Sequence, residues 1–162
     1  MKKAFLLLLF ITVMLSSCSQ RNDLLYYQNS VFYAECTLNG EYKITILKSD
    51  GEYEIGFTEP TELSHILFKI GKEPYVLCDN GDKIPLPSDK IDGIYAICGM
   101  LELSEDYMTN AVPADGECAV YSFLKGDILY EITYNKHSLP IRAKITSSEL
   151  HYEIKFDAIK LS

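Results

Sequence analysis

The sequence is poor in the groups that enzymes and metal sites use most. It contains only three histidines, His65, His137 and His151, and none of them lies in a recognisable nucleophile or metal motif. No CxxC or CxxH spacing predicts a zinc site, and no glycine-rich loop is arranged to cradle a phosphate. We therefore expect no catalytic residue, no bound metal and no cofactor.

Two acidic patterns are explained better by local structure than by chemistry. Glu52 and Glu54 flank an apolar Tyr53, so both carboxylates should face solvent from one strand, whereas a glycosidase pair is held across a cleft. Residues 79–82, DNGD, resemble half of a calcium loop, but the remaining ligands are missing and a hairpin turn accounts for them. The protein is not expected to be an enzyme.

Basic residues are also scarce. The 162 residues hold 15 Lys and Arg against 23 Asp and Glu, a formal charge of −8, which becomes −10 if a leader containing Lys2 and Lys3 is removed. Such a surface repels phosphate backbones and anionic headgroups. Nucleic-acid binding is therefore not expected, and any membrane contact should not depend on a basic patch.

One apolar run stands out at residues 4–14, directly after Lys2 and Lys3. A helix of that length spans about 16 Å, roughly half of the hydrocarbon core, so a cleaved export signal is favoured over a membrane span. The run ends in Leu15-Ser16-Ser17-Cys18, which resembles the bacterial lipobox, in which the cysteine thiol carries a diacylglycerol. The alternative is a plain secretory signal followed by a stray thiol.

These features predict a lipid-anchored protein on the extracytoplasmic face of the cell membrane. Residues 1–17 form the lipoprotein signal peptide, residues 18–23 the lipidated tether, and residues 24–162 a single domain large enough for its own core. The membrane partner is reached through the Cys18 lipid, at about 0.8 kcal/mol per buried methylene. The remaining Cys36, Cys78, Cys98 and Cys118 allow either two disulfides, with three pairings, or small buried hydrophobic positions.

Alternating short runs rich in Tyr, Ile, Val and Phe predict antiparallel strands. We expect them at residues 31–38, 42–48, 52–58, 66–70, 75–78, 118–124, 128–134, 141–146 and 152–161. The turns Asn39-Gly40, Asp50-Gly51, Asn80-Gly81 and Lys125-Gly126 separate neighbouring runs, and Asn-Gly or Asp-Gly suits a type I′ hairpin. Pro85 and Pro87 restrict their segment to a sheet edge or an irregular stretch.

The apolar period changes between residues 88 and 103, where a helix is expected. Ser88 or Asp89 can cap it, and residues 91, 94, 95, 98 and 101 share one face. Gly93 and Gly99 each weaken it by about 1 kcal/mol relative to Ala, so this helix should depend on tertiary packing. Residues 104–110 are expected to add a short acidic turn.

The predicted fold is α+β and mainly antiparallel β, with about nine or ten strands and one central helix. The order of its elements resembles the LolA-type carrier family of the bacterial envelope, and still more the small lipidated members found in Gram-positive bacteria. The resemblance rests on the step Phe57, Glu59, Pro60, Glu62, Leu63, on Leu139-Pro140 within residues 129–145, and on patterning over residues 24–161.

The resemblance implies an open, curved half-barrel sheet wrapped on a helix, with a hydrophobic concavity and no catalysis. Relatives carry lipoproteins, sense envelope stress or assist spore-envelope processes. This chain differs in being anchored, and the functional arginine of the soluble carrier has no counterpart here.

Two functions follow as hypotheses. In the first, a concave groove binds a lipid, an acyl chain or a lipoprotein segment. The inward residues expected to line it are Tyr42, Ile44, Ile46, Tyr53, Ile55, Phe57 and Phe68. In the second, the core is dry and the protein is an envelope scaffold that docks a cationic protein partner at Glu102, Glu105 and Asp106.

Overall fold

The computed structural model describes residues 24–87, 92–116 and 118–162. The predicted signal peptide, the tether with Cys18 and the proposed helix caps Ser88 and Asp89 lie outside the described residues, as does Ile91 of the predicted helical face.

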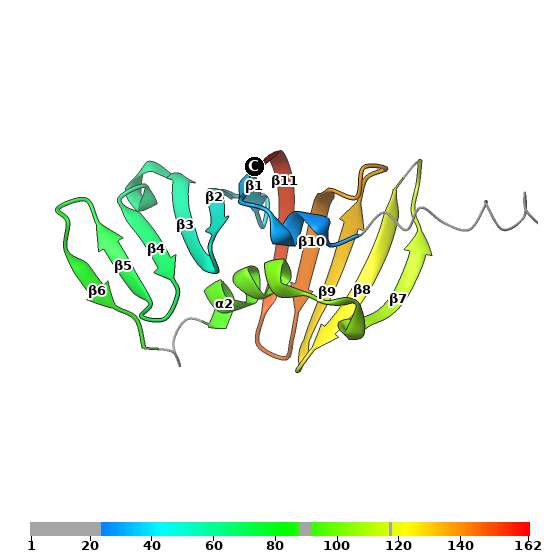
Figure 1. The fold of residues 1–162 in the computed structure, drawn as a ribbon. Helices are drawn as coiled ribbons and strands as arrows, with labels where there is room; N and C mark the ends of the chain where they lie inside the picture. Colours follow the sequence, from blue (N-terminus) through cyan, green and yellow to red (C-terminus); the bar gives the residue numbers. More distant parts are fainter. Residues whose placement is uncertain (1–23, 88–91, 117) are drawn as a thin grey trace, which may run out of the picture.

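Eleven strands form one open antiparallel sheet (Figure 1). The strands are β1 (Phe32–Leu38), β2 (Tyr42–Ser49), β3 (Glu52–Glu59), β4 (Ile66–Ile70), β5 (Tyr75–Cys78), β6 (Lys83–Pro85), β7 (Met108–Pro113), β8 (Ala119–Lys125), β9 (Ile128–Tyr134), β10 (Pro140–Thr146) and β11 (His151–Leu161). Their order across the sheet is β6-β5-β4-β3-β2-β1-β11-β10-β9-β8-β7, so the first and last strands pair at its centre. The predicted mainly antiparallel architecture is confirmed.

Two strands lie outside the nine expected ranges: the three-residue β6, in the segment expected to be a sheet edge or irregular, and β7, which the apolar pattern did not reveal. Five of its six residues are exposed, so the segment has no alternation between apolar and polar positions. It is paired on one side only, with β8, and it contains Pro113. An exposed edge strand carries little of the periodic signal from which strands are read.

Two of the predicted tight hairpins have the backbone that their sequences require. Asn39 and Gly40 have φ of 53° and 73°, and Asp50 and Gly51 have φ of 52° and 77°, as both central residues of a type I′ turn must. At the β5–β6 hairpin only Gly81 is positive, at 86°, and its N–H donates to the carbonyl of Cys78. That connection is a longer loop with one left-handed glycine, so the type I′ expectation for Asn80-Gly81 is wrong.

One α-helix is present among the described residues, α2 (Asp92–Gly99), and it continues as the 3-10 turn η4 (Met100–Glu102). It lies over the middle strands in Figure 1. Both of its glycines permit close approach to the sheet. A Cβ on Gly93 would overlap the Tyr152 hydroxyl oxygen, and one on Gly99 would lie 2.6 Å from the Tyr130 hydroxyl oxygen. The two glycines lower the intrinsic stability of the helix, but they allow it to pack closely against β11 and β9. This contact explains why a helix of low propensity forms here.

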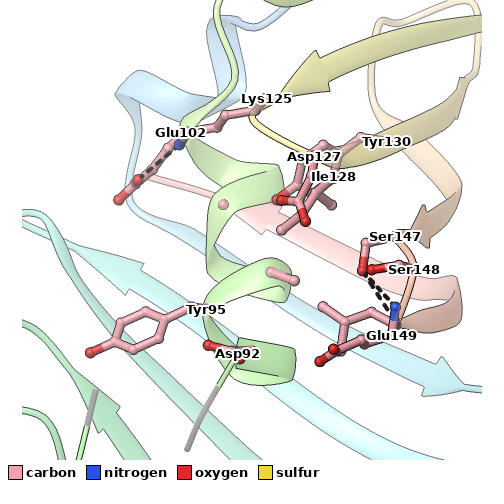
Figure 2. Close-up of a pocket in the computed structure, with 13 residues that line it drawn as sticks. Asp92, Tyr95, Glu102, Lys125, Asp127, Ile128, Tyr130, Ser147, Ser148 and Glu149 are labelled. Carbon is pink, nitrogen blue, oxygen red and sulfur yellow. Dashed lines mark hydrogen bonds and ion pairs between the residues drawn. The ribbon is translucent and has the colours of Figure 1, made fainter. Parts of the chain in front are cut away.

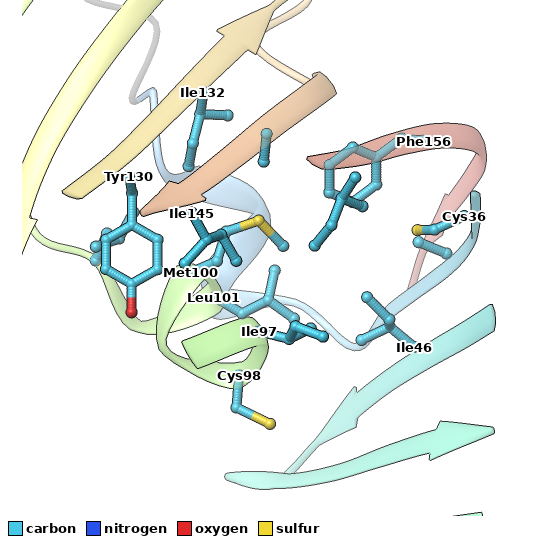
Figure 3. Close-up of a cluster of buried hydrophobic side chains, with 14 of the residues drawn as sticks. Cys36, Ile46, Ile97, Cys98, Met100, Leu101, Tyr130, Ile132, Ile145 and Phe156 are labelled. Atoms are coloured by element: carbon cyan, nitrogen blue, oxygen red, sulfur yellow. The ribbon is translucent and has the colours of Figure 1, made fainter. Parts of the chain in front are cut away.

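The core lies between α2 and one face of the sheet, which we call the inner face. Strand β1 alternates buried and less buried residues along its whole length, as predicted. Ile46, Ile97 and Leu101 are at most 2 % exposed and belong to one apolar cluster (Figure 3). The 3-10 turn η1 (Tyr26–Asn29), which was not predicted, covers the same face through Tyr27, whose ring contacts Phe32 and Tyr134.

Both outer strands present an edge with few free N–H groups. The Leu86 N–H donates to the Pro74 carbonyl, so these two residues form a hydrogen-bonded pair between β5 and β6. Hydrogen-bonded pairs alternate along antiparallel strands, and the backbone groups of Lys83 and Pro85 therefore face away from β5. Pro85 has no N–H to offer, and its strand lies at the edge of the sheet, the first of the two settings predicted for this segment.

On β7 the Ala114 N–H donates to the Cys118 carbonyl, so these two residues form a hydrogen-bonded pair. Because such pairs alternate along antiparallel strands, the backbone groups of Ala111 and Pro113 face away from β8. The Asn110 Oδ1 already accepts the Ala111 N–H at 2.9 Å, and Pro113 has none. Both edges are therefore protected against strand addition.

Cys36, Cys78, Cys98 and Cys118 are all free thiols. Cys36 and Cys98 are 1 % and 4 % exposed, and burial raises the pKa of each to about 12. These two behave as small buried hydrophobic residues, one of the two alternatives left open by the sequence. Within the described ranges, no helix is long and apolar enough to cross a bilayer.

Candidate functional site

The seven residues predicted to line a groove divide into two groups. Ile44, Ile46, Tyr53 and Ile55 are between 0 and 3 % exposed and lie in the core cluster. Tyr42, Phe57 and Phe68 are only partly buried and pack against the edge of that cluster. Only this second group can contact a ligand without displacing the helix.

The three partly buried aromatics form a continuous row. The Tyr42 and Phe57 rings have centroids 6.1 Å apart at 83°, and the Phe57 and Phe68 rings have centroids 6.3 Å apart at 62°. Edge-to-face packing of this kind stabilises each pair by about 0.5–1.5 kcal/mol beyond the area that it buries. The row is therefore a preformed apolar surface that extends from β2 to β4.

Burial along the inner face decreases toward the β6 edge. Ile55, Phe68, Val76 and Ile84 are directly opposite one another on β3, β4, β5 and β6, so they point to the same side of the sheet. Ile55 is fully buried, Phe68 and Val76 are intermediate, and Ile84 is 55 % exposed. We call Tyr42, Phe57, Phe68, Val76 and Ile84 the apolar wing.

The other half of the inner face is filled. Ile145, Tyr130 and Phe123 are directly opposite one another on β10, β9 and β8, and all are at most 1 % exposed. Tyr27 packs on Tyr134 there, with the two hydroxyl oxygens 3.2 Å apart. The apolar wing is thus an asymmetric feature, because α2 and η1 cover the middle strands and the β8–β10 half.

Polar contacts hold the C-terminal end of the α2–η4 unit against the sheet. The Tyr53 hydroxyl donates to Glu102 Oε1 at 2.8 Å, and the Lys125 Nζ lies 3.4 Å from Glu102 Oε2. Burial, followed by the bond to Glu102, raises the pKa of Tyr53, so its hydroxyl stays protonated as the donor.

Lys48 adds further hydrogen bonds at the same end of the α2–η4 unit. Its Nζ donates to the backbone carbonyls of Gln28, at 2.6 Å, and Leu101, at 3.0 Å. It therefore joins η1 and η4 to β2, and burial lowers its pKa. These contacts fix the helix position that hides four of the seven predicted residues.

Two clefts flank the solvent side of α2. One, of about 590 Å³, lies between the helix, the β8–β9 turn and the β10–β11 turn (Figure 2). The other, of about 600 Å³, lies between the helix, the β2–β3 turn and the β4–β5 connection. Glu102 lines both, whereas Glu105 and Asp106 of the predicted docking edge are exposed on η5 (Glu105–Tyr107). The structure does not gather those three carboxylates into one cleft.

The histidines remain apart from these features. His65 Nδ1 lies 2.9 Å from Asp79 Oδ2 in an exposed pair, and His137 and His151 are exposed. In the part of the chain that the structure describes, no three His, Cys, Asp or Glu side chains are placed to hold one metal ion.

Comparison with known proteins identifies the fold but no family. No protein-family model matches the chain, and no curated protein matches it by sequence. It is similar in structure to an uncharacterized conserved protein from Thermus thermophilus, at 13 % identity and a TM-score of 0.51, over 86 % of this chain and 84 % of that one.

A second solved structure is the hypothetical protein CT021 from Chlamydia trachomatis, at 14 % identity and a TM-score of 0.44, over 81 % of this chain and 87 % of that one. The likeness to the Thermus protein concerns the fold alone. The chain is accordingly a mainly antiparallel β-protein with one open sheet and a single described helix, similar in fold to an uncharacterized protein.

Proposed function

We propose that the protein is a non-catalytic lipoprotein, anchored through Cys18 on the extracytoplasmic face of the cell membrane, which binds a hydrophobic ligand on the apolar wing. The observation that carries the proposal is the exposure gradient along the inner face, from a fully buried Ile55 to an Ile84 that is 55 % exposed. An apolar surface that the described residues leave uncovered is typical of a binding site.

An acyl chain of a lipid suits this surface best. The aromatic row offers ring edges and faces without hydrogen-bonding groups apart from the Tyr42 hydroxyl, and a flexible chain can follow it across several strands. The domain begins to pack at Leu24, which is 9 % exposed, so a six-residue tether from Cys18 would keep it within about 20 Å of the anchor. Lipids would then be within reach of the wing.

The proposal includes the finer family assignment, that of a small lipidated relative of the LolA-type carriers. It is supported by the open antiparallel sheet and by an apolar inner face that one helix covers only in part. The partly uncovered surface runs from Tyr42 on β2 and Phe57 on β3 to β6. Of the seven predicted residues, only Tyr42, Phe57 and Phe68 are therefore proposed to contact the ligand directly.

A matched pair of substitutions on one strand tests the ligand site. Phe68 faces the apolar wing, and the adjacent Leu67, also partly buried, faces the opposite side of β4. Titration of the full chain with a fluorescent fatty acid in a non-ionic detergent should give saturable binding. Phe68→Ser should weaken it about tenfold or more, because one buried large apolar side chain contributes about 1.5–3 kcal/mol. Leu67→Ser should leave it nearly unchanged.

Equal losses in the two variants, or no saturable binding by the wild type, would contradict the apolar wing as a ligand site. Circular dichroism of each variant shows that the sheet is retained. The scaffold alternative, in which a cationic protein partner docks on acidic groups, is favoured by the net charge of −8 and by the cluster of buried apolar residues beneath α2. A partner retained at 0.5 M salt in a pull-down would argue against that electrostatic version.

A further inference from the structure

The cleft beside α2, the β8–β9 turn and the β10–β11 turn combines carboxylates that have no ion-pair partner with the hydroxyl of a tyrosine whose ring is buried. Its charged and polar lining is drawn in Figure 2. Three carboxylates come from three separate elements: Asp92 from the start of α2, Asp127 from the β8–β9 turn and Glu149 from the β10–β11 turn. None of these three carboxylates has an ion pair or a hydrogen bond with another described residue. Glu102, which also lines the cleft, accepts a hydrogen bond from Tyr53 and pairs with Lys125.

Tyr130 supplies an independent reason to expect a ligand here. Its side chain is 1 % exposed and yet lines this cleft, and its hydroxyl oxygen lies 2.6 Å from the position that a Cβ on Gly99 would take. Gly99 lines the same cleft, so the hydroxyl end of the tyrosine is the part that reaches it. No hydrogen bond joins this hydroxyl to any residue that the structure describes. The side chain is thus buried except at its hydroxyl, which is open to the cleft and free to bond a ligand there.

The chemistry of the lining selects the charge of the ligand. Burial, followed by the nearby Glu102, raises the pKa of Tyr130 to about 12, so its oxygen is a neutral hydrogen-bond acceptor and donor. The cleft therefore presents acceptor groups in excess, and an anion would be repelled. The carboxylates also do not converge on one point, since no three metal-ligating side chains are grouped in the described residues. Separated acceptors fit separated positive charges better than a single metal ion.

We propose that this cleft binds a linear organic amine with two or more ammonium groups. Ammonium groups donate hydrogen bonds and accept none, so they match Asp127, Glu149 and the Tyr130 oxygen, while the methylene segments between them can lie along Ile128 and Leu150. The site is separate from the apolar wing, because it lies on the β8–β11 side of α2. The inference therefore does not depend on the ligand proposed for the wing.

Calorimetric titration with spermidine at low salt tests the proposal on the full chain in a non-ionic detergent. The wild type should bind one equivalent saturably. The pair Asp127→Asn with Glu149→Gln should weaken binding by about tenfold or more, because each removes a hydrogen bond to a charged group. Tyr130→Phe, which removes only the unpartnered hydroxyl, should weaken it about threefold or more on the same grounds.

The control pair makes the same charge change elsewhere. Glu41→Gln with Asp115→Asn alters two exposed carboxylates that do not line the cleft, and should change the affinity less than about twofold. Equal losses in both pairs would reduce the effect to diffuse attraction by a negative protein and overturn the proposal.

Three other results would also overturn it: no saturable binding of spermidine, displacement of spermidine by equimolar magnesium, or binding of a lysine-rich peptide without binding of spermidine. Phe68→Ser should bind spermidine as the wild type does, so the failure of one site is distinguishable from the failure of the other.

Discussion

Substituting Gly99 by alanine should destabilise the protein, although alanine is the better helix former. Gly99 has φ of −58° and ψ of −28°, which any L-residue adopts, so backbone strain plays no part. The added Cβ would lie 2.6 Å from the Tyr130 hydroxyl oxygen and 3.6 Å from the Cζ atom behind it. Because the Tyr130 ring is buried between β8 and β10, it cannot swing aside without disturbing Phe123 or Ile145.

The magnitude follows from two opposing effects. Overpacking a well-filled core typically destabilises by about 1–3 kcal/mol, and Gly→Ala in a helix returns up to about 1 kcal/mol. Gly99→Ala alone should therefore lower the free energy of unfolding by about 1 kcal/mol. In a Tyr130→Phe background the clashing atom is absent and the remaining contact at 3.6 Å is ordinary, so the same Gly99→Ala change should stabilise by up to about 1 kcal/mol.

The assay is urea unfolding of the wild type, both single variants and the double variant, followed by circular dichroism. The account requires a change of sign between the two backgrounds, which is a coupling energy of about 1–3 kcal/mol between residues in contact. If Gly99→Ala has the same effect with and without the Tyr130 hydroxyl, then close packing of α2 on β9 does not explain the glycine.

Three further predictions concern the Lys48 hydrogen bonds, the sheet edges and the outer face. Lys48→Met removes the donor to the carbonyls of Gln28 and Leu101 and should lower the free energy of unfolding by about 1–3 kcal/mol, as measured by urea titration. Lys72→Met, at an exposed position, should change it by less than about 0.5 kcal/mol. Asn110→Ala releases the Ala111 N–H and Pro113→Val adds a second outward N–H on β7, so the double variant should form dimers or larger assemblies in analytical ultracentrifugation. An unchanged sedimentation coefficient would refute the edge protection. Hydrogen bonds from Thr37 and then Lys155 lower the pKa of Asp157 to about 2 from 3.8, so its carboxylate stabilises the fold above pH 4 and this contribution is lost as the pH falls to 2; Asp157→Asn should flatten the acid limb of an unfolding curve measured against pH.

The central strands could be predicted from the sequence because each has one face exposed to solvent and one face buried in the core. Phe32, Ala34, Cys36 and Leu38 alternate with less buried residues, and the structure buries these four. The edge strand β7 could not be read in this way, since nearly all of it is exposed. Turn η1 was also missed, because four residues that include two tyrosines carry no period by which a 3-10 turn could be recognised.

The candidate site shows the same limit at the level of single residues. Alternation placed Ile44, Ile55 and Phe68 on one face of the sheet, and that much is confirmed. It could not show which part of the face the helix covers, because that depends on contacts far apart in the chain, such as Tyr53 with Glu102 and Lys48 with Leu101. The unpartnered Tyr130 hydroxyl was equally invisible, since a buried tyrosine in a strand normally finds a partner.

Native mass spectrometry of the protein extracted from its own membranes tests the central claim most directly, because one spectrum reports both the anchor and the ligand. The account predicts a mature chain that begins at Cys18, carries a diacylglycerol on that residue and retains a non-covalent apolar ligand. The ligand should be lost from Phe68→Ser and kept by Leu67→Ser. A chain with a free Cys18, a different first residue, or no apolar ligand in the wild type would contradict it.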